Sequence, residues 1–177
     1  MRVSDLLSAL RVADATLSVA ESCTGGMLGS AITEVPGASD VFWGGVIAYD
    51  NAAKSSLLGV DPAVLARFGA VSEETARLMA AGLRARSGTT WSVAITGIAG
   101  PGGTARGKPV GTVWIAVDGP VARASKFHFA GGRSEVRRRA VESALTLLRD
   151  ASAEADEHGR AGARGDATSA GVRARGG

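Results

Sequence analysis

Apolar runs typical of strands alternate along this chain with segments whose apolar positions recur at helical spacing. The strand-like runs lie at residues 16–20, 41–49, 91–96, 110–117 and 121–129. Helices are predicted to begin near residues 4, 27, 51, 62, 72 and 131. Strands separated by helices predict an α/β domain, which we expect to be a three-layer α/β/α arrangement around a mixed sheet.

Turn and capping residues refine this expectation. Asp118-Gly119-Pro120 joins the last two strand-like runs, which predicts an antiparallel hairpin. The run at 41–49 predicts a buried strand in which Gly44-Gly45 marks a bulge or a close backbone approach. Ser4, Asp50 or Asn51, and Ser72 are candidate N-caps, and Asp61-Pro62 opens a further helix.

The apolar pattern stops near residue 150, so residues 1–150 are predicted to form one domain. After Leu148, the only aliphatic side chain larger than alanine is Val172. A segment of this composition buries too little apolar surface to offset its ordering entropy. We therefore expect residues 151–177 to be a mostly disordered tail rich in Ala, Gly and Arg, with the last helix fraying into it.

Composition and charge exclude several classes of protein. The formal net charge of +3 comes from 20 basic and 17 acidic residues, and aromatics are 5%, too few for a platform that stacks nucleic-acid bases. One cysteine and two histidines predict no internal disulfide and no metal site. No run of eighteen apolar residues and no signal peptide is visible, so we expect a cytoplasmic protein without a membrane span.

Ser22 is the first candidate for chemistry. It follows a strand and precedes Thr24-Gly25-Gly26 and a helix, so backbone N–H groups there could hold an anion or a substrate carbonyl. This arrangement is typical of a serine nucleophile on a sharp strand-to-helix turn. The same position also suits a simple N-cap, made by Ser22 or Thr24.

A serine nucleophile needs a base, and the sequence favours a lysine over a histidine. His158 falls in the predicted tail, and His128 lies in an alternating strand. Lys54 follows a buried apolar run, where a lysine loses pKa and can accept a proton near neutral pH. Tyr49, the only tyrosine, could orient that lysine or relay its proton. The alternative is that Lys54 is an exposed lysine on an amphipathic turn.

Three further features could bind or react. Cys23 is a rival nucleophile if the helix lowers the pKa of its thiol, or otherwise a small buried apolar residue. The loop from Thr96 through Gly97 and Gly100 offers backbone N–H groups to an anion, although it matches neither the Walker A pattern nor G-x-G-x-x-G; the alternative is a purely structural turn. Arg133 opens the last helix and Arg137 lies one turn further on, where a bound phosphate would offset the conflict of arginine with the helix dipole; the alternative, favoured for Arg138 and Arg139, is a solvated basic face.

Taken in order, these motifs closely resemble the CinA C-terminal domain family over residues 1–150. The resemblance rests on Ala20-Glu21-Ser22-Cys23-Thr24-Gly25-Gly26, Tyr49-Asp50-Asn51-Ala52-Ala53-Lys54, Gly69-Ala70-Val71-Ser72, Thr96-Gly97-Ile98-Ala99-Gly100-Pro101-Gly102-Gly103 and Lys108-Pro109-Val110-Gly111-Thr112-Val113-Trp114. Characterised members of the family are nicotinamide-nucleotide amidases. The resemblance thus implies hydrolysis of nicotinamide mononucleotide to nicotinate mononucleotide and ammonia, in pyridine-nucleotide salvage.

The resemblance also implies roles for single residues. The family's serine nucleophile falls on Ser22, its lysine base on Lys54 and its assisting tyrosine on Tyr49. The hydroxyl residue that opens its glycine-rich loop falls on Thr96. Its Gly-Asp-Arg motif is Gly131-Gly132-Arg133 here, and glycine in place of aspartate leaves both Arg133 and Arg137 as candidates for the phosphate contact.

The resemblance implies no cofactor and a homo-oligomer. Many family members carry a further N-terminal domain linked to ADP-ribose hydrolysis, and we expect that activity to be absent from this chain. Two other functions stay open on the sequence: a non-enzymatic nucleotide-binding or competence- and repair-related module, and a hydrolase that uses Cys23.

Overall fold

The computed structural model describes residues 2–102 and 107–169, with the backbone alone for residues 160–169. The helices are α1 (Val3–Val12), α2 (Met27–Thr33), the short 3₁₀ helix η1 (Ala38–Asp40), α3 (Asn51–Leu58), α4 (Pro62–Phe68), α5 (Glu73–Ser87) and α6 (Arg133–Ser169). The strands are β1 (Leu17–Glu21), β2 (Phe42–Ile47), β3 (Trp91–Gly97), β4 (Thr112–Asp118) and β5 (Arg123–His128). Gly103, which belongs to the glycine-rich motif, lies outside the described residues.

The strands form one mixed sheet in the order β2-β1-β3-β4-β5. β2, β1 and β3 run parallel, while β4 is antiparallel to β3 and β5 is antiparallel to β4. The predicted mixed sheet and its hairpin are therefore confirmed. Within the described part of the chain, no helix is long and apolar enough to cross a membrane.

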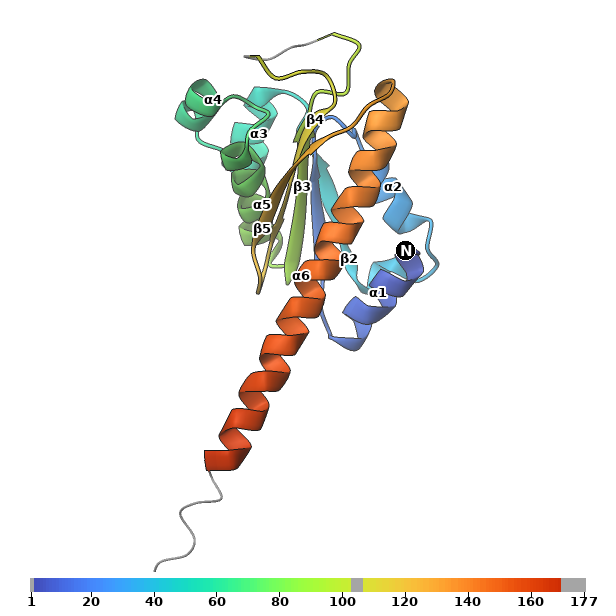
Figure 1. The fold of residues 1–177 in the computed structure, drawn as a ribbon, viewed down its shortest axis with the longest axis vertical. Coiled ribbons are helices and arrows are strands. Elements are labelled where there is room, and N and C mark those ends of the chain that lie inside the picture. Colours follow the sequence, from blue (N-terminus) through green and yellow to red (C-terminus); the bar gives the residue numbers. More distant parts are fainter. Residues whose placement is uncertain (1, 103–106, 170–177) are drawn as a thin grey trace, which may run out of the picture.

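Helices cover both faces of the sheet, which confirms the three-layer prediction (Figure 1). α1, α2 and α6 bury one face around residues such as Leu10, Ile32 and Val136. α5, with α3 and α4 beside it, buries the other around Leu58 and Met79. Both layers are needed because the central strands β1 and β3 are buried on both sides.

Local signals set most helix starts. The Asp50 side chain accepts the N–H of Ala52 at 2.7 Å, and that of Asp61 accepts the N–H of Ala63 at 2.8 Å. Ser72 caps α5 by accepting the N–H of Thr75. The predicted cap at Ser4 is wrong, because Ser4 lies within α1, which begins at Val3 after Arg2 and has no side-chain cap.

β2 differs from the prediction of a buried strand. Among the described residues, it lies at the edge of the sheet and pairs with β1 alone, and its residues alternate between half-buried and exposed. The predicted irregularity is present: the register with β1 shifts between Leu17 and Ser18, which leaves Trp43 as an extra residue. A Cβ at Gly45 would stand 2.7 Å from the Val19 side chain, so the two backbones approach closely there.

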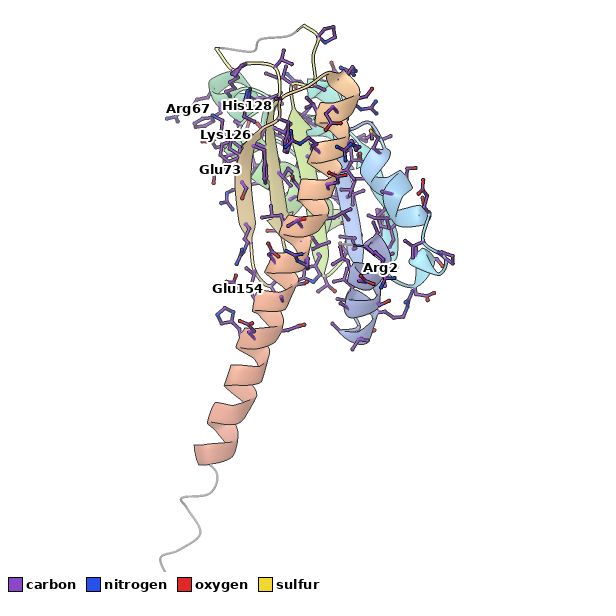
Figure 2. The ribbon with its side chains drawn as sticks, turned by 45° about the vertical axis from the view of Figure 1, so that its right-hand side comes forward. Arg2, Arg67, Glu73, Lys126, His128 and Glu154 are labelled. Atoms are coloured by element: carbon purple, nitrogen blue, oxygen red, sulfur yellow. The ribbon has the colours of Figure 1, made fainter. Side chains whose placement is uncertain are left out.

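The last helix continues beyond the predicted end near residue 149 and runs to Ser169 (Figure 1). Ala151 is fully buried in the core, and Glu154, labelled in Figure 2, forms an ion pair with Arg123 of β5. Alanine has the highest helix propensity, which lets an apolar-poor segment continue a helix that packing has already nucleated. The division of the chain at residue 150 stays a prediction, and residues 170–177 lie outside the described residues.

Candidate active site

A cavity of about 250 Å³ lies at the carboxyl ends of β1 and β3. This is the end of a parallel sheet at which α/β proteins usually bind ligands. Seven of the predicted site residues line it: Ser22, Tyr49, Lys54, Thr96, Gly97, Gly100 and Arg133. Thr24, Gly25, Gly26 and Arg137 are not among its lining residues.

Ser22 sits on a turn that the backbone fixes at both ends. Its N–H donates to the carbonyl of Ile95 on β3 at 3.0 Å, and its own carbonyl accepts the N–H of Gly25 at 3.1 Å. The helix that follows has Gly26 at its N-cap, with a φ of +95° and no side-chain cap. Neither Ser22 nor Thr24 is therefore the helix cap, and the Ser22 side chain faces the cavity instead.

Lys54 is almost fully buried, with 1% of its surface exposed, which rules out the exposed-lysine alternative. Its Nζ donates to the carbonyls of Ala48 at 3.1 Å and Tyr49 at 3.2 Å. Burial lowers the pKa of the Lys54 amine below its ordinary value of 10.5, and the Asp50 carboxylate only partly opposes that effect. Among the described hydrogen bonds, none joins Lys54 Nζ to Ser22 Oγ, although both residues line the cavity.

Arg133 forms hydrogen bonds to two walls of the cavity. One nitrogen of its guanidinium donates to the carbonyl of Gly100 at 2.8 Å, and another donates to the hydroxyl of Tyr49 at 2.9 Å. The glycine-rich loop and the segment after β2 therefore meet at the first residue of α6. These two bonds leave further guanidinium N–H groups for a ligand, since arginine carries five donors.

The first turn of α2 is already occupied by a carboxylate of the protein itself. The buried Glu21 side chain accepts the N–H groups of Gly26 at 3.0 Å, Leu28 at 3.1 Å and Gly29 at 2.8 Å. The amides at which the sequence predicts an anion site are thus largely satisfied internally. Glu21 was not a predicted site residue. Its position at the end of a buried strand, where a carboxylate needs hydrogen-bond partners, is the feature of the sequence that could have indicated it.

Arg137 contacts the same turn from α6. Its guanidinium donates to the carbonyl of Thr24 at 2.6 Å, which holds α6 against the residues after Ser22. Its Nε and the Thr24 hydroxyl are both buried without a hydrogen-bond partner. Arg138, by contrast, is exposed and pairs with Glu135 and Glu142, so the basic-face alternative holds for that residue.

The segment after α4 forms the opposite wall. The hydroxyl of Thr96 donates to the carbonyl of Ala70 at 2.7 Å, and Lys108 Nζ donates to the carbonyls of Phe68 and Val71. Ala70 and Val71 line the cavity, as does Asn51 at the start of α3. None of these three was a predicted site residue, because only the packing of separate segments brings them there.

Cys23 is poorly suited to act as a nucleophile. It is buried, and burial raises the pKa of its thiol to about 11, so the reactive thiolate is scarce at neutral pH. Its sulfur packs against Gly97, where an added Cβ would stand 3.1 Å from Sγ and 2.7 Å from the Val113 side chain.

His128 is exposed on β5 (Figure 2) and does not line the cavity. Among the described residues, no three His, Cys, Asp or Glu side chains form a metal-binding group.

Sheet and cavity together define a class: three-layer α/β proteins with a polar site where the parallel strands end. The model of the CinA C-terminal domain matches residues 2–152, and the chain belongs to that family. A CinA-like protein of Trichormus variabilis is 51% identical over 144 residues, which are 79% of this chain and 35% of that protein. One of Gemmatimonas aurantiaca is 53% identical over 148 residues, 82% of this chain and 34% of that protein. The chain therefore spans about a third of the length of these relatives.

Solved structures share the fold. The competence/damage inducible protein CihA of Agrobacterium tumefaciens superposes with a TM-score of 0.83 at 38% identity, covering 85% of this chain and 93% of that one. The competence damage-inducible protein A of Klebsiella pneumoniae gives a TM-score of 0.82 at 32% identity, covering 86% of this chain and 98% of that one. The resemblance to the CinA C-terminal domain family, and the fold it implied, are confirmed.

Proposed function

We propose that this protein hydrolyses the carboxamide of nicotinamide mononucleotide, giving nicotinate mononucleotide and ammonia. The observation that carries the proposal is a serine and a buried lysine opening on one cavity, beside a tyrosine and an arginine. A module that only binds nucleotides has no need of a desolvated lysine there, since burying an amine is costly. The resemblance to characterised nicotinamide-nucleotide amidases supports this choice of substrate.

The hydrogen bonds of Lys54 support its role as the base. A neutral amine has two N–H groups and one lone pair. The carbonyls of Ala48 and Tyr49 accept two N–H groups, which leaves the lone pair to take the proton of Ser22. A protonated Lys54 has a third N–H to satisfy in a buried place, and this favours the neutral form.

In the proposed reaction, Ser22 Oγ attacks the amide carbon while Lys54 takes its proton. The C–N bond breaks as Lys54 returns that proton to the departing ammonia, and water then hydrolyses the acyl-serine ester to the acid. Tyr49 either orients Lys54 or relays the proton. Because Glu21 engages the amides of α2, we assign the oxyanion to N–H groups nearer Ser22 or in the loop after Gly97.

Arg133 is the proposed contact for the substrate phosphate. It lines the cavity, and its planar fork suits a phosphate. Binding energy from the phosphate can orient the amide at Ser22. Pyridine-nucleotide salvage takes place in the cytoplasm, so the proposal also places the protein there.

The test is ammonia release from nicotinamide mononucleotide by the wild type, Ser22→Ala and Lys54→Ala, each with EDTA present. We expect an active wild type and a loss of at least about 1000-fold in both variants, since a nucleophile and its base act as one unit. Ser30→Ala and Lys126→Ala, which change an exposed serine and an exposed lysine, serve as matched controls and should keep full activity.

Each other outcome has a definite meaning. A folded wild type that releases no ammonia rejects the substrate or the enzyme itself, and nucleotide-binding measurements then test the non-enzymatic alternative. If Ser22→Ala retains activity, Ser22 is not the nucleophile, and Cys23 is the next residue to test. Loss of wild-type activity with EDTA, restored by a divalent cation, rejects the metal-free mechanism.

A further inference from the structure

Arg137 of α6 lies against the turn at residues 22–26, which carries the candidate nucleophile and which we call the nucleophile turn. α6 packs against α2, the helix that follows this turn (Figure 1). The Arg137 guanidinium donates to the carbonyl of Thr24 at 2.6 Å, and a Cβ built on Gly25 would stand 3.5 Å from its Nη2 atom. Arg133, one helical turn earlier, lines the cavity, whereas Arg137 is not among the lining residues. Two arginines on one face of α6 therefore reach two different places.

The nucleophile turn depends on bonds from outside it to keep its shape. Its two glycines both have positive φ, +57° and +95°, and glycine adopts many other conformations at little cost. On the donor side, the buried Glu21 carboxylate accepts the N–H of Gly26 at 3.0 Å. On the acceptor side, Arg137 holds the Thr24 carbonyl. A carboxylate and a guanidinium from two different elements thus hold the turn from which the Ser22 side chain faces the cavity.

The positive charge of Arg137 is not paired with a carboxylate. Among the ion pairs of the described residues, none includes Arg137, whereas its neighbour Arg138 pairs with two glutamates. Burial raises the pKa of the Cys23 thiol, and the Arg137 charge partly opposes that rise, so its field reaches the residue beside Ser22. Acyl transfer places negative charge on the substrate oxygen next to the nucleophile, and a nearby cation stabilises that charge.

Two buried polar atoms of these contacting residues have no hydrogen-bond partner within the described part of the chain, the Nε of Arg137 and the hydroxyl oxygen of Thr24. Thr24 is fully buried. Leaving such groups unpaired lowers stability, and an apolar side chain in place of Arg137 would pack there without that cost. Stability alone therefore does not account for a guanidinium at this position, which favours a role in the reaction.

We propose that Arg137 is a positioning residue for the candidate nucleophile. By holding the Thr24 carbonyl, it keeps the nucleophile turn in the shape that points Ser22 at the substrate. Its charge stabilises the reacting oxygen without touching the substrate. This role rests on the proposed function for its reaction, and it leaves the phosphate contact, for which Arg137 was a second candidate, to Arg133.

Steady-state kinetics of Arg137→Met test this role, because methionine keeps a long apolar stem and removes both the donor and the charge. We expect kcat to fall about 100-fold, the loss that a misplacement of about 1 Å can cause, with KM changed less than about 3-fold. The loss should be equal for nicotinamide mononucleotide and for the nucleoside that lacks the phosphate. Arg138→Met, which changes the exposed neighbouring arginine, should keep full activity.

A fluorophosphonate, which reacts with activated serines, measures the same effect without the substrate. Mass spectrometry should locate the label on Ser22 in the wild type, and the labelling rate should fall in Arg137→Met in parallel with kcat. Circular dichroism verifies that the variant is folded. If Arg137→Met does not fold, Arg137→Lys, which keeps the charge but not the planar fork, should show a smaller fall in kcat at unchanged KM.

Two results for a folded variant overturn this role. A KM that rises with the nucleotide but not with the nucleoside makes Arg137 a phosphate contact. Unchanged kcat and labelling rate, with or without a lower melting temperature, mean that Arg137 serves only the packing of α6. A wild type that releases no ammonia but is labelled at Ser22 rejects the proposed substrate, and the labelling rates then decide the role of Arg137 by themselves. A wild type that releases no ammonia and is not labelled at Ser22 overturns both proposals.

Discussion

The guanidinium of Arg133 donates a 2.9 Å hydrogen bond to the hydroxyl oxygen of Tyr49, a residue 84 positions earlier in the chain. The same guanidinium holds the carbonyl of Gly100 at 2.8 Å. One side chain at the start of α6 therefore fixes both the loop after β3 and the segment after β2. A ligand that binds Arg133 is placed against both walls of the cavity.

Arg133→Ala is predicted to weaken binding of a phosphorylated substrate. Losing a hydrogen bond to a charged group costs about 1.5–3 kcal/mol, so KM should rise about 10- to 150-fold. Steady-state kinetics with nicotinamide mononucleotide and with the nucleoside that lacks the phosphate separate two roles. If the phosphate is the ligand, the KM effect is absent with the nucleoside; an equal effect on both substrates means that Arg133 acts through Tyr49 and Gly100 alone.

Tyr49→Phe removes the hydroxyl that Arg133 contacts and is predicted to lower kcat about 10-fold or more, through the loss of a positioning or relay group. Because the ring stays in place, stability should change little. Stopped assays of kcat with parallel thermal melts measure both quantities. If Tyr49→Phe keeps the wild-type kcat, the Tyr49 hydroxyl has no role in the reaction.

The lowered pKa of Lys54 predicts a pH-dependent stability. Between its folded pKa and 10.5, the unfolded chain binds a proton that the native protein does not, so native stability rises with pH. The free energy of unfolding should thus fall by about 1.4 kcal/mol per pH unit as the pH drops through that window, and then level off below the folded pKa.

Lys54→Met isolates this effect, because methionine fills a similar volume and cannot ionise. Denaturant unfolding across a pH series should show that the stability of Lys54→Met gains on that of the wild type as the pH falls. The exposed Lys126→Met should give no such trend. A difference between wild type and Lys54→Met that is constant with pH would mean that Lys54 titrates normally in the folded protein.

Glu21→Ala is predicted to destabilise the protein by about 2–4 kcal/mol. Its carboxylate accepts three N–H groups at the start of α2, and alanine leaves donors in a mostly buried place without partners. Thermal or denaturant unfolding measures the loss. Glu34→Ala, which removes an exposed glutamate just after the same helix, should change stability by less than about 0.5 kcal/mol.

The raised pKa of Cys23 predicts a thiol that resists alkylation. At pH 8 the group is almost wholly protonated and buried, so iodoacetamide should modify it slowly in the native protein and rapidly in denaturant. Mass spectrometry follows the modification, and ammonia release should persist after native treatment. Rapid native labelling that abolishes activity would instead support the hydrolase that uses Cys23.

The sequence by itself determined the order of the strands and α-helices, the cap at Ser72 and the helix start at Asp61-Pro62, because apolar periodicity and capping are local properties. It left the cap of α3 between Asp50 and Asn51. It also indicated which residue types gather at the strand ends. It placed β2 in the interior and ended the last helix too early. Apolar content does not tell whether a strand is central or at an edge, and the packing of Ala151 depends on distant residues.

Only the tertiary structure decided which candidates share one cavity. Ser22, Lys54 and Arg133 lie on three separate segments, and packing across the sheet brings them together. Burial of Lys54 and the occupation of the α2 amides by Glu21 are likewise properties of the folded chain. Desolvation and hydrogen-bond satisfaction depend on every neighbour in space, so spacing along the sequence cannot supply them.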